Sequence, residues 1–239
     1  MDAFIRVENL IGKQKLQKLN TSFVAVFGIG GVGGFVCEAL VRSGVGKIAI
    51  FDGDTVDISN LNRQIIATDT TIGQDKVEAM KQRLLSINEN LEIETKKIFY
   101  LPENADQIDL SNYDYIVDAV DTVSAKLEII SRAKALNIPV ISCMGTGGKL
   151  QIEKLKVADI CKTQGCPLAR VMRRELKKRN ITGVKVVYSE ESVELGDVDK
   201  TQSENTKKIA PPSMIFVPAV AGLYIAREVV MDLIKDKEN

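Results

Sequence analysis

The stretch that decides the fold is FVAVFGIGGVGG, residues 23–34. Its first part, residues 23–28, is apolar and partly β-branched, which predicts a buried parallel strand. Residues 32–42 then show the pattern of a helix that stops at Ser43-Gly44. The glycines between strand and helix are Gly28, Gly30, Gly31 and Gly33. In this context small residues let the backbone and the helix N-terminus approach a phosphate, so the stretch predicts a nucleotide-binding loop.

The segments on either side of this loop alternate between strand and helix patterns. Strands are predicted at 47–52, 91–98, 115–119, 140–143, 149–160 and 184–188, and helices at 73–86, 124–136, 168–178 and, started by a proline, 218–234. The alternation predicts an α/β fold with a Rossmann-like, doubly wound, mostly parallel sheet, C-terminal strands and a packed C-terminal helix. We expect a single domain over residues 1–239. Residues 1–148 would form the nucleotide-binding half, and residues 149–239 the substrate-binding half, with a mobile polar loop at 189–213.

The composition excludes several classes of protein. The 239 residues include no histidine, which removes Ser-His-Asp and Cys-His catalysis and every histidine metal site. No two of the four cysteines have CxxC spacing, so a zinc tetrad is not expected. Lys plus Arg and Asp plus Glu number 32 each, so no overall charge points to nucleic acid or membrane. Residues 1–20 lack a signal-peptide core, and the longest apolar run is shorter than the ~20 residues of a spanning helix. We expect a cytoplasmic protein with no membrane partner.

Polar side chains follow the ends of successive predicted strands. They lie in DGDTVDISNLNRQ (52–64), GQDK (73–76) and DAVDT (118–122). Each charge alone would be an ordinary solvated residue, but as a series after a phosphate loop they indicate a site. Asp52 ends the second strand, where a carboxylate can accept hydrogen bonds from a ribose. An enzyme that splits ATP between its α and β phosphates needs cations at the triphosphate and an acidic anchor for magnesium. Arg63 and Lys76 can supply the cations and Asp121 the anchor. A hydride-transfer enzyme instead needs an apolar site for the nicotinamide ring and gains nothing from these charges.

These motifs, together with GIGGVGG (28–34), resemble those of the adenylating family that includes the ubiquitin-activating enzymes and the bacterial ThiF and MoeB proteins. The resemblance implies bound ATP and Mg²⁺. It implies a nucleotide site in which Asp52 and Asp54 bind the cofactor and Asp121 holds magnesium. The residues that contact the phosphates would be Asn60, Arg63, Gln64 and Lys76. Arg6 falls where family members have an arginine that reaches the partner subunit's nucleotide, which implies a homodimer and a catalytic role for Arg6.

Members of this family join a carboxylate to AMP, and a carboxylate already ionised needs no histidine base. The second half of the chain resembles the tRNA threonylcarbamoyladenosine dehydratases. That resemblance runs through DAVDTVSAKLEII (118–130), MGTGGKL (144–150), VADICKT (157–163), CPLARVMRRELKKR (166–179) and FVPAVAGLYIAREVVMDL (216–233). It implies ATP-dependent cyclisation of threonylcarbamoyladenosine in tRNA, with release of AMP and pyrophosphate. The attacking group would belong to the substrate itself. A sulfur-relay protein is a further candidate partner.

A basic stripe supports an RNA substrate. On the predicted helix 168–178, basic residues recur at i, i+3 and i+4 spacing and share one face. The candidate tRNA-binding residues are Lys162, Arg170, Arg173, Arg174, Lys177 and Lys178. Such a stripe can bind the phosphates of a folded RNA, although an ordinary solvated helix face has the same pattern.

Three other functions compete with the dehydratase. The first is adenylation of the C-terminal glycine of a ubiquitin-like sulfur-carrier protein, although most such enzymes carry paired CxxC zinc ligands that this chain lacks. The second is a tRNA-binding module with a vestigial nucleotide site. The third is an NAD oxidoreductase, which the charged series disfavours.

Overall fold

The computed structural model describes residues 3–192 and 211–235 of the protein. Within them a seven-stranded sheet has the order β3-β2-β1-β4-β5-β7-β6, and every neighbouring pair is parallel except β6 and β7. The strands are β1 (Phe23–Phe27), β2 (Lys47–Phe51), β3 (Glu92–Lys96), β4 (Tyr115–Asp118), β5 (Val140–Cys143), β6 (Leu155–Asp159) and β7 (Lys185–Ser189). The helices are α1 (Ile5–Ile11), α2 (Lys13–Thr21), α3 (Gly33–Arg42), α4 (Lys76–Ile87), α5 (Val123–Ala135), α6 (Pro167–Lys178) and α7 (Phe216–Ile234). The predicted α/β class and mostly parallel sheet are confirmed.

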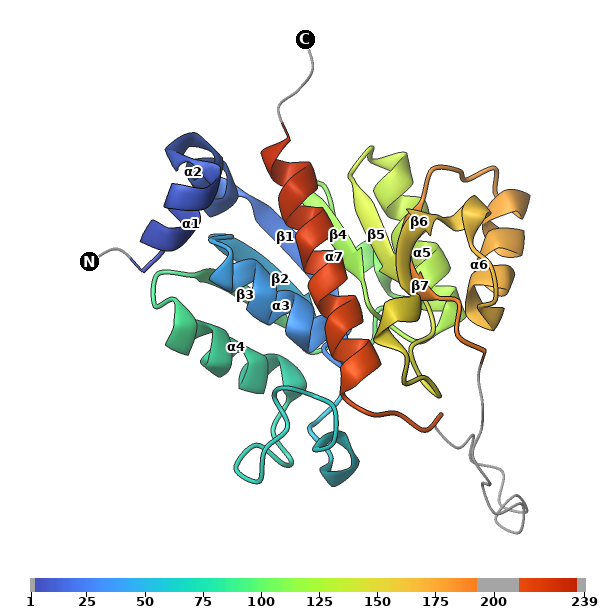
Figure 1. Ribbon diagram of the computed structural model, residues 1–239, viewed down its shortest axis with the longest axis horizontal. Helices are drawn as coiled ribbons and strands as arrows, with labels where there is room; N and C mark the ends of the chain where they lie inside the picture. The colour runs from blue at the N-terminus through green and yellow to red at the C-terminus, as the bar shows by residue number, and fades with distance from the viewer. Residues whose placement is uncertain (1–2, 193–210, 236–239) are drawn as a thin grey trace.

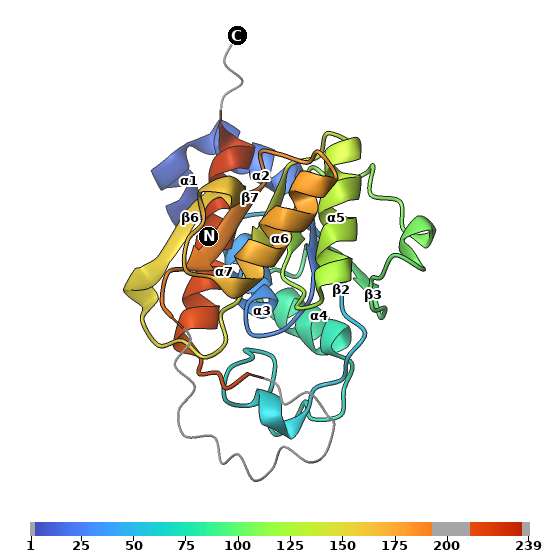
Figure 2. The same cartoon turned by 90° about the vertical axis from the view of Figure 1, so that its right-hand side faces the viewer.

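Helices cover both faces of this sheet. On one face α3, α4 and α7 bury their apolar sides, and Figure 1 shows α3 and α7 crossing the sheet side by side. On the other face α5 and α6 pack together, as Figure 2 shows. Strand β1 serves both cores, because Val24 and Val26 face the first and Ala25 and Phe27 the second. A strand buried on two sides needs the unbroken apolar run that the sequence has here.

The strand order reverses direction between β1 and β4. From β1 the chain moves outward through β2 to β3, and it then returns to the other side of β1 to form β4 and β5. The connections after β1 and β4 therefore leave the sheet in opposite directions, and a crevice opens at the carboxyl ends of these strands. Two glycines let the segments pass closely. Gly28 has φ +89°, and a Cβ there would lie 2.7 Å from the Ala119 carbonyl oxygen; a Cβ on Gly33 would lie 1.8 Å from the Gly28 oxygen.

The structure corrects several predicted elements. The N-terminal residues, which gave no helical prediction, form α1 and α2, whose buried contacts come only from a few apolar residues such as Leu16 and Leu19. The strand predicted over 149–160 shrinks to β6, because residues 152–154 form a 3₁₀ turn. The helix predicted from residue 73 begins at Lys76, and α7 begins at Phe216, so that Pro218 lies in its first turn.

The polar loop predicted over 189–213 is described only at its two ends. Ser189 belongs to β7, and Glu191 accepts hydrogen bonds from the backbone N–H groups of Leu150 and Gln151. Residues 193–210 lie outside the described residues. Among the helices of the described chain, none combines the length and apolarity that crossing a membrane requires.

Candidate nucleotide-binding site

A cavity of about 620 Å³ lies at the carboxyl ends of the central strands, where the order of the sheet reverses. Its lining residues run from Phe27 to Pro218 in the sequence, and they include the segments that follow β1, β2 and β4 and precede α4. The predicted cofactor residues that line it are Gly28, Gly30, Gly31, Asp52, Asp54, Asn60, Arg63, Gln64, Lys76 and Asp121. Except for Gly33 and Arg6, every residue assigned to nucleotide binding or catalysis from the sequence therefore meets in one cleft.

Asp52 joins the glycine loop to the segment after β2. One carboxylate oxygen accepts a hydrogen bond from the Ile29 backbone N–H at 2.6 Å, and the other accepts from the Asp54 N–H at 2.8 Å. Burial raises the pKa of the Asp52 carboxyl above its usual range, while the neighbouring Lys76 charge acts in the opposite direction. The carboxylate is thus held at the end of β2 with its acceptor oxygens fixed.

Lys76 is the main buried cation of the cleft. It is the first residue of α4, and its side chain is 7% exposed. Its ammonium group lies 2.9 Å from the carboxylate of Asp54. The Asp54 side chain is 52% exposed. The buried amine is oriented by a partner that solvent and ligands can also reach. An arriving phosphate would meet a cation that is already positioned.

The segment after β2 presents amide and guanidinium groups to the cleft. The Asn60 side-chain oxygen accepts from the Asp57 N–H at 3.0 Å and closes a short 3₁₀ turn. Arg63 donates to the Ser59 carbonyl oxygen at 2.7 Å, which leaves other guanidinium N–H groups for an anion. Gln64 is buried, and its Oε1 has no hydrogen-bond partner within the described residues. A buried polar atom without a partner in a cleft wall is typical of a site that receives its partner from a ligand.

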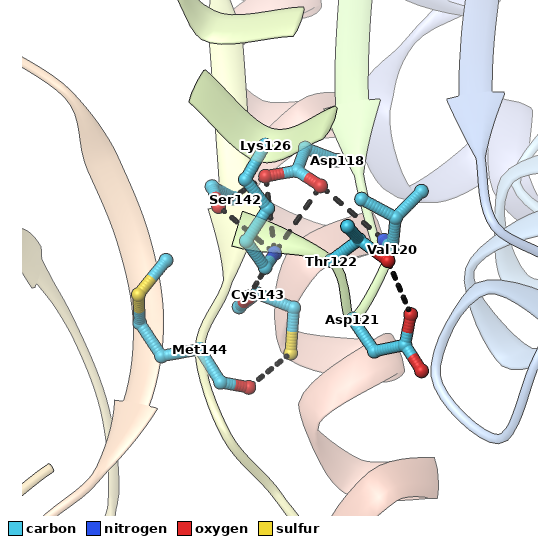
Figure 3. A network of polar contacts seen from close by, with 8 residues as sticks. All are labelled: Asp118, Val120, Asp121, Thr122, Lys126, Ser142, Cys143 and Met144. Atoms are coloured by element: carbon cyan, nitrogen blue, oxygen red, sulfur yellow. Dashed lines mark hydrogen bonds and ion pairs between the residues drawn. The ribbon is translucent and has the colours of Figure 1, made fainter. Parts of the chain in front are cut away.

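Asp121 follows β4 and, like Asp54, is an exposed carboxylate of the cleft. It accepts a hydrogen bond from the Thr122 hydroxyl at 3.2 Å, and in Figure 3 its carboxylate points away from the buried side chains of Asp118, Lys126 and Ser142. The described residues contain no cluster of three metal-binding side chains. Magnesium bound to nucleotides needs only one or two protein carboxylates, because phosphates and waters supply the other ligands. One exposed carboxylate in the cleft wall fits that requirement.

Two of the wall segments that were not predicted follow β3 and β5, and a third consists of Pro211, Ser213 and Pro218. Residues 98–101 follow β3, and the Phe99 ring, 58% exposed, packs directly over Gly53. This exposed ring offers a flat apolar face for a purine base. Residues 143–147 follow β5 and line the opposite side. The aromatic pair Phe99-Tyr100 after a predicted strand was the available signal for the first segment.

Gly33 and Arg6 differ from their predicted places. Gly33 does not line the cleft, and its lack of a side chain instead allows α3 to start against the Gly28 carbonyl group. Arg6 is exposed on α1, which lies beside the amino end of β1 in Figure 1, at the other end of the sheet from the cleft. Within one chain Arg6 therefore does not reach the nucleotide site.

The predicted basic stripe lies on α6, and its members have different surroundings. Arg173 is half-buried and donates to the carbonyl and hydroxyl oxygens of Thr163 at 2.8 and 2.6 Å. Arg174 and Lys178 are exposed and pair with Glu175. Hydrogen bonds from Lys178 and Arg179, and a weaker one from Arg174, lower the pKa of the Glu175 carboxyl to about 2. Among the described contacts none pairs Lys162, Arg170 or Lys177 with an acid, and all three are exposed. Leu168, in the first turn of α6, lines the cleft, so the helix that carries the exposed cations starts at the cleft wall.

A buried ion pair lies directly beneath the cleft. Lys126 and Asp118 have side chains that are 1% and 0% exposed, and the ammonium nitrogen lies 3.1 Å from a carboxylate oxygen. Ser142 donates to the same carboxylate at 2.5 Å. Figure 3 shows these side chains converging from β4, α5 and β5. Asp118 stood in the polar series of the sequence, but its depth and its lysine partner were not predicted.

Comparisons with known proteins agree with this geometry. The ThiF family matches residues 4–239. The tRNA threonylcarbamoyladenosine dehydratase of Bacillus subtilis is 44% identical over 243 aligned residues, which cover 98% of this chain and 96% of that protein. The crystal structure of the Escherichia coli tRNA N6-threonylcarbamoyladenosine dehydratase in complex with ATP superimposes with a TM-score of 0.86 at 29% identity, covering 97% and 93% of the two chains. The complex of the same enzyme with AMP gives a TM-score of 0.87 at 30% identity and the same coverage.

Proposed function

Because the chain belongs to the ThiF family, we propose that it is an ATP-dependent tRNA threonylcarbamoyladenosine dehydratase. The observation that carries this proposal is the convergence of the glycine loop, Asp52, Lys76, Arg63 and Asp121 on one cleft. The near full-length similarity to the B. subtilis dehydratase, and the structural similarity to a dehydratase that binds ATP and AMP, support the choice of substrate.

The first chemical step joins the threonyl carboxylate of the modified adenosine to AMP. A carboxylate oxygen attacks the α-phosphorus of ATP, the bond to the β-phosphate oxygen breaks, and pyrophosphate leaves with the electron pair. The glycine loop and the N-terminus of α3 hold the phosphates, and Asp52 accepts from the ribose. Lys76 and Arg63 offset the charge that builds on the phosphoryl oxygens. Bound Mg²⁺, held by Asp121, would add Lewis-acid stabilisation of the same charge.

The second step closes the ring. The ureido group next to the activated carboxyl attacks its carbonyl carbon, loses a proton, and releases AMP. One oxygen of the original carboxylate leaves with AMP, so the base loses one water overall. The attacking group belongs to the same molecule as the carbon that it attacks. Their proximity and orientation accelerate ring closure, and no enzyme nucleophile is needed.

The test is mass analysis of nucleosides from tRNA that carries threonylcarbamoyladenosine, after incubation with the protein and magnesium ATP. The expected product is one water lighter, and AMP and pyrophosphate form in equal amounts. ATP turnover without loss of water would point to another acceptor. A requirement for a small protein ending in Gly-Gly would identify the sulfur-carrier reaction, and tRNA binding that ignores ATP would identify a vestigial site.

Asp52→Asn is expected to weaken ATP binding about tenfold or more at neutral pH, because a charged acceptor for the ribose is lost. Burial raises the Asp52 pKa, so acidification protonates this carboxyl at a higher pH than an exposed aspartate. In the parent, ATP affinity should fall as the pH drops through that raised pKa. The difference between parent and variant should shrink in the same range, and this comparison cancels the titration of ATP itself. Calorimetric titrations of ATP into the parent and the variant at several pH values measure the two affinities. A difference in affinity that does not change with pH would contradict the assignment.

The exposed cations of α6 are proposed to bind tRNA phosphates. Arg170 and Lys177 are two helical turns apart, and Arg173 is better left unchanged because it bonds to Thr163. Arg170→Glu with Lys177→Glu should weaken tRNA binding and lower the slope of log K against log salt by about two. Lys13→Glu with Lys81→Glu, on α2 and α4, makes the same change in net charge and is the control. Equal effects of the two double variants on tRNA binding would show that the stripe on α6 is an ordinary solvated helix face.

We propose that Arg6 acts on the nucleotide of a second copy of the chain in a homodimer, since it does not reach its own cleft. Arg6→Ala and Asp121→Ala should each lose most of the parent activity. A mixture of equal parts, refolded or exchanged together, should regain about a quarter of the parent activity, because half of the dimers are mixed and each has one intact site. A mixture as inactive as its components would contradict action between subunits.

We also propose that a sulfur-relay protein docks on this enzyme. A pull-down with the purified partner would test this proposal.

A further inference from the structure

The buried pair Asp118–Lys126 contacts both wall segments that flank the phosphate end of the cleft. Asp118 is the last residue of β4 and lies opposite Ser142 of β5, one residue before that strand ends at Cys143. Beyond these positions the chain continues into residues 119–122 on one side and 143–147 on the other, and both segments line the cleft. The pair therefore lies at the point where both walls leave the sheet.

Each partner of the pair holds one backbone peptide group in place. Asp118 accepts a hydrogen bond from the Val120 N–H at 3.2 Å, one residue before Asp121. Lys126 donates to the Cys143 carbonyl oxygen at 2.6 Å. The same peptide group carries the Met144 N–H, which donates to the Val187 oxygen at 2.8 Å. The peptide between Cys143 and Met144 is thus fixed at both ends, and Figure 3 shows the lysine reaching it from α5.

Stability alone does not require this arrangement. Two buried charges are costly to desolvate, and an apolar pair of similar size often stabilises a core equally well. The other buried positions of β4 and β5 on this face, such as Ile116 and Val140, are apolar. The charged pair lies at the ends of the two strands, where the chain leaves the sheet and continues into the segments that line the cleft. Removing it would leave the Cys143 carbonyl group without the donor that fixes its direction.

We propose that Lys126 is a positioning residue for adenylate formation, which sets the 143–147 wall through the Cys143 carbonyl group. This inference rests on the proposed function. Lys126 does not line the cleft and touches no reacting atom. The glycine loop, Asp52 and Lys76, which supply most of the nucleotide contacts, are not bonded to it. Loss of Lys126 should therefore slow the reaction and leave the affinity for ATP nearly unchanged.

The test uses the double variant Asp118→Asn with Lys126→Met, since Lys126→Met alone leaves a buried carboxylate unpaired and endangers folding. The asparagine oxygen still accepts from the Val120 N–H, while the Cys143 carbonyl group loses its donor. We expect kcat for AMP formation on modified tRNA to fall about tenfold or more and Kd for ATP to change less than about threefold. Hydrogen exchange of the Met144 amide should become about tenfold faster, and that of Val120 should not change.

Tyr115→Phe is the matched control. Tyr115 is buried at the other end of β4, about 10 Å from Asp118 along the strand, and its hydroxyl donates to Asp232. This variant also removes a polar contact of a buried side chain, and it should keep the parent kcat and Met144 exchange. Parent-like kcat and exchange in the double variant, or equal losses in both variants, would overturn the proposal. If the parent does not cyclise modified tRNA, the proposed function fails, and Met144 exchange still decides whether Lys126 fixes this wall.

Discussion

Asp121→Ala is expected to lower turnover of saturating ATP and modified tRNA by about a hundredfold to a thousandfold, the loss seen when one preorganised charge-stabilising group is removed. Asp121 is exposed at the end of β4 and its only described side-chain contact is with Thr122, so its removal should leave the melting temperature nearly unchanged. The measurements are AMP release under saturating conditions and thermal unfolding of the same samples.

Asp69→Ala is the control for that experiment. It removes an exposed carboxylate that does not line the cleft, and should leave both turnover and melting temperature as in the parent. The assignment also predicts that the residual activity of Asp121→Ala needs more Mg²⁺ than the parent, since a protein ligand to the metal is lost. Turnover of Asp121→Ala within a few-fold of the parent would show that the metal is held elsewhere.

Lys126→Met is expected to have the largest effect on stability, about 3–5 kcal/mol of the free energy of unfolding, because a buried carboxylate loses its countercharge. Asp118 would keep only Ser142 and the Val120 N–H as partners in a site without solvent. Urea unfolding at neutral pH measures the loss. The variant with Asp118→Asn added should recover most of it, since no unpaired charge remains.

Tyr115→Phe again provides the comparison, and should cost about 1–2 kcal/mol, the loss of one hydrogen bond to a charged acceptor. A loss below about 1 kcal/mol for Lys126→Met would mean that water or a rearranged side chain replaces the ammonium group, contrary to the full burial of both side chains.

Much of the fold and cleft could be predicted because the signals are local and the topology repeats. The apolar run 23–28, the glycines after it and the helix beyond are neighbours in sequence, and each has its own pattern. Parallel strands place their carboxyl ends at one edge of a sheet, so residues that follow β1, β2 and β4 must come together. Arg63, Lys76 and Asp121 could be assigned to one cleft on that basis, without knowledge of any contact.

Elements with weak local signals were missed. Helices α1 and α2 expose most of their residues and bury only Leu16 and Leu19 in the described chain, so their apolar pattern is faint. The strand predicted over 149–160 was too long, because only residues 155–159 pair with β7, at the edge of the sheet, and residues 152–154 form a 3₁₀ turn. Arg173 has the spacing of its neighbours on α6, but its contact with Thr163 depends on how the preceding loop folds back.

The sequence by itself determined the class of fold, the phosphate loop and the identity of the groups that surround it, because periodicity, glycine spacing and charge are properties of short segments. Only the tertiary structure decided what each charge does there. Asp118 and Asp121 are three residues apart in DAVDT, yet one is fully buried against Lys126 and the other is exposed in the cleft. That difference follows from the packing of α5 and β5 around the end of β4, and burial in such a packing is a property of segments that are distant in sequence.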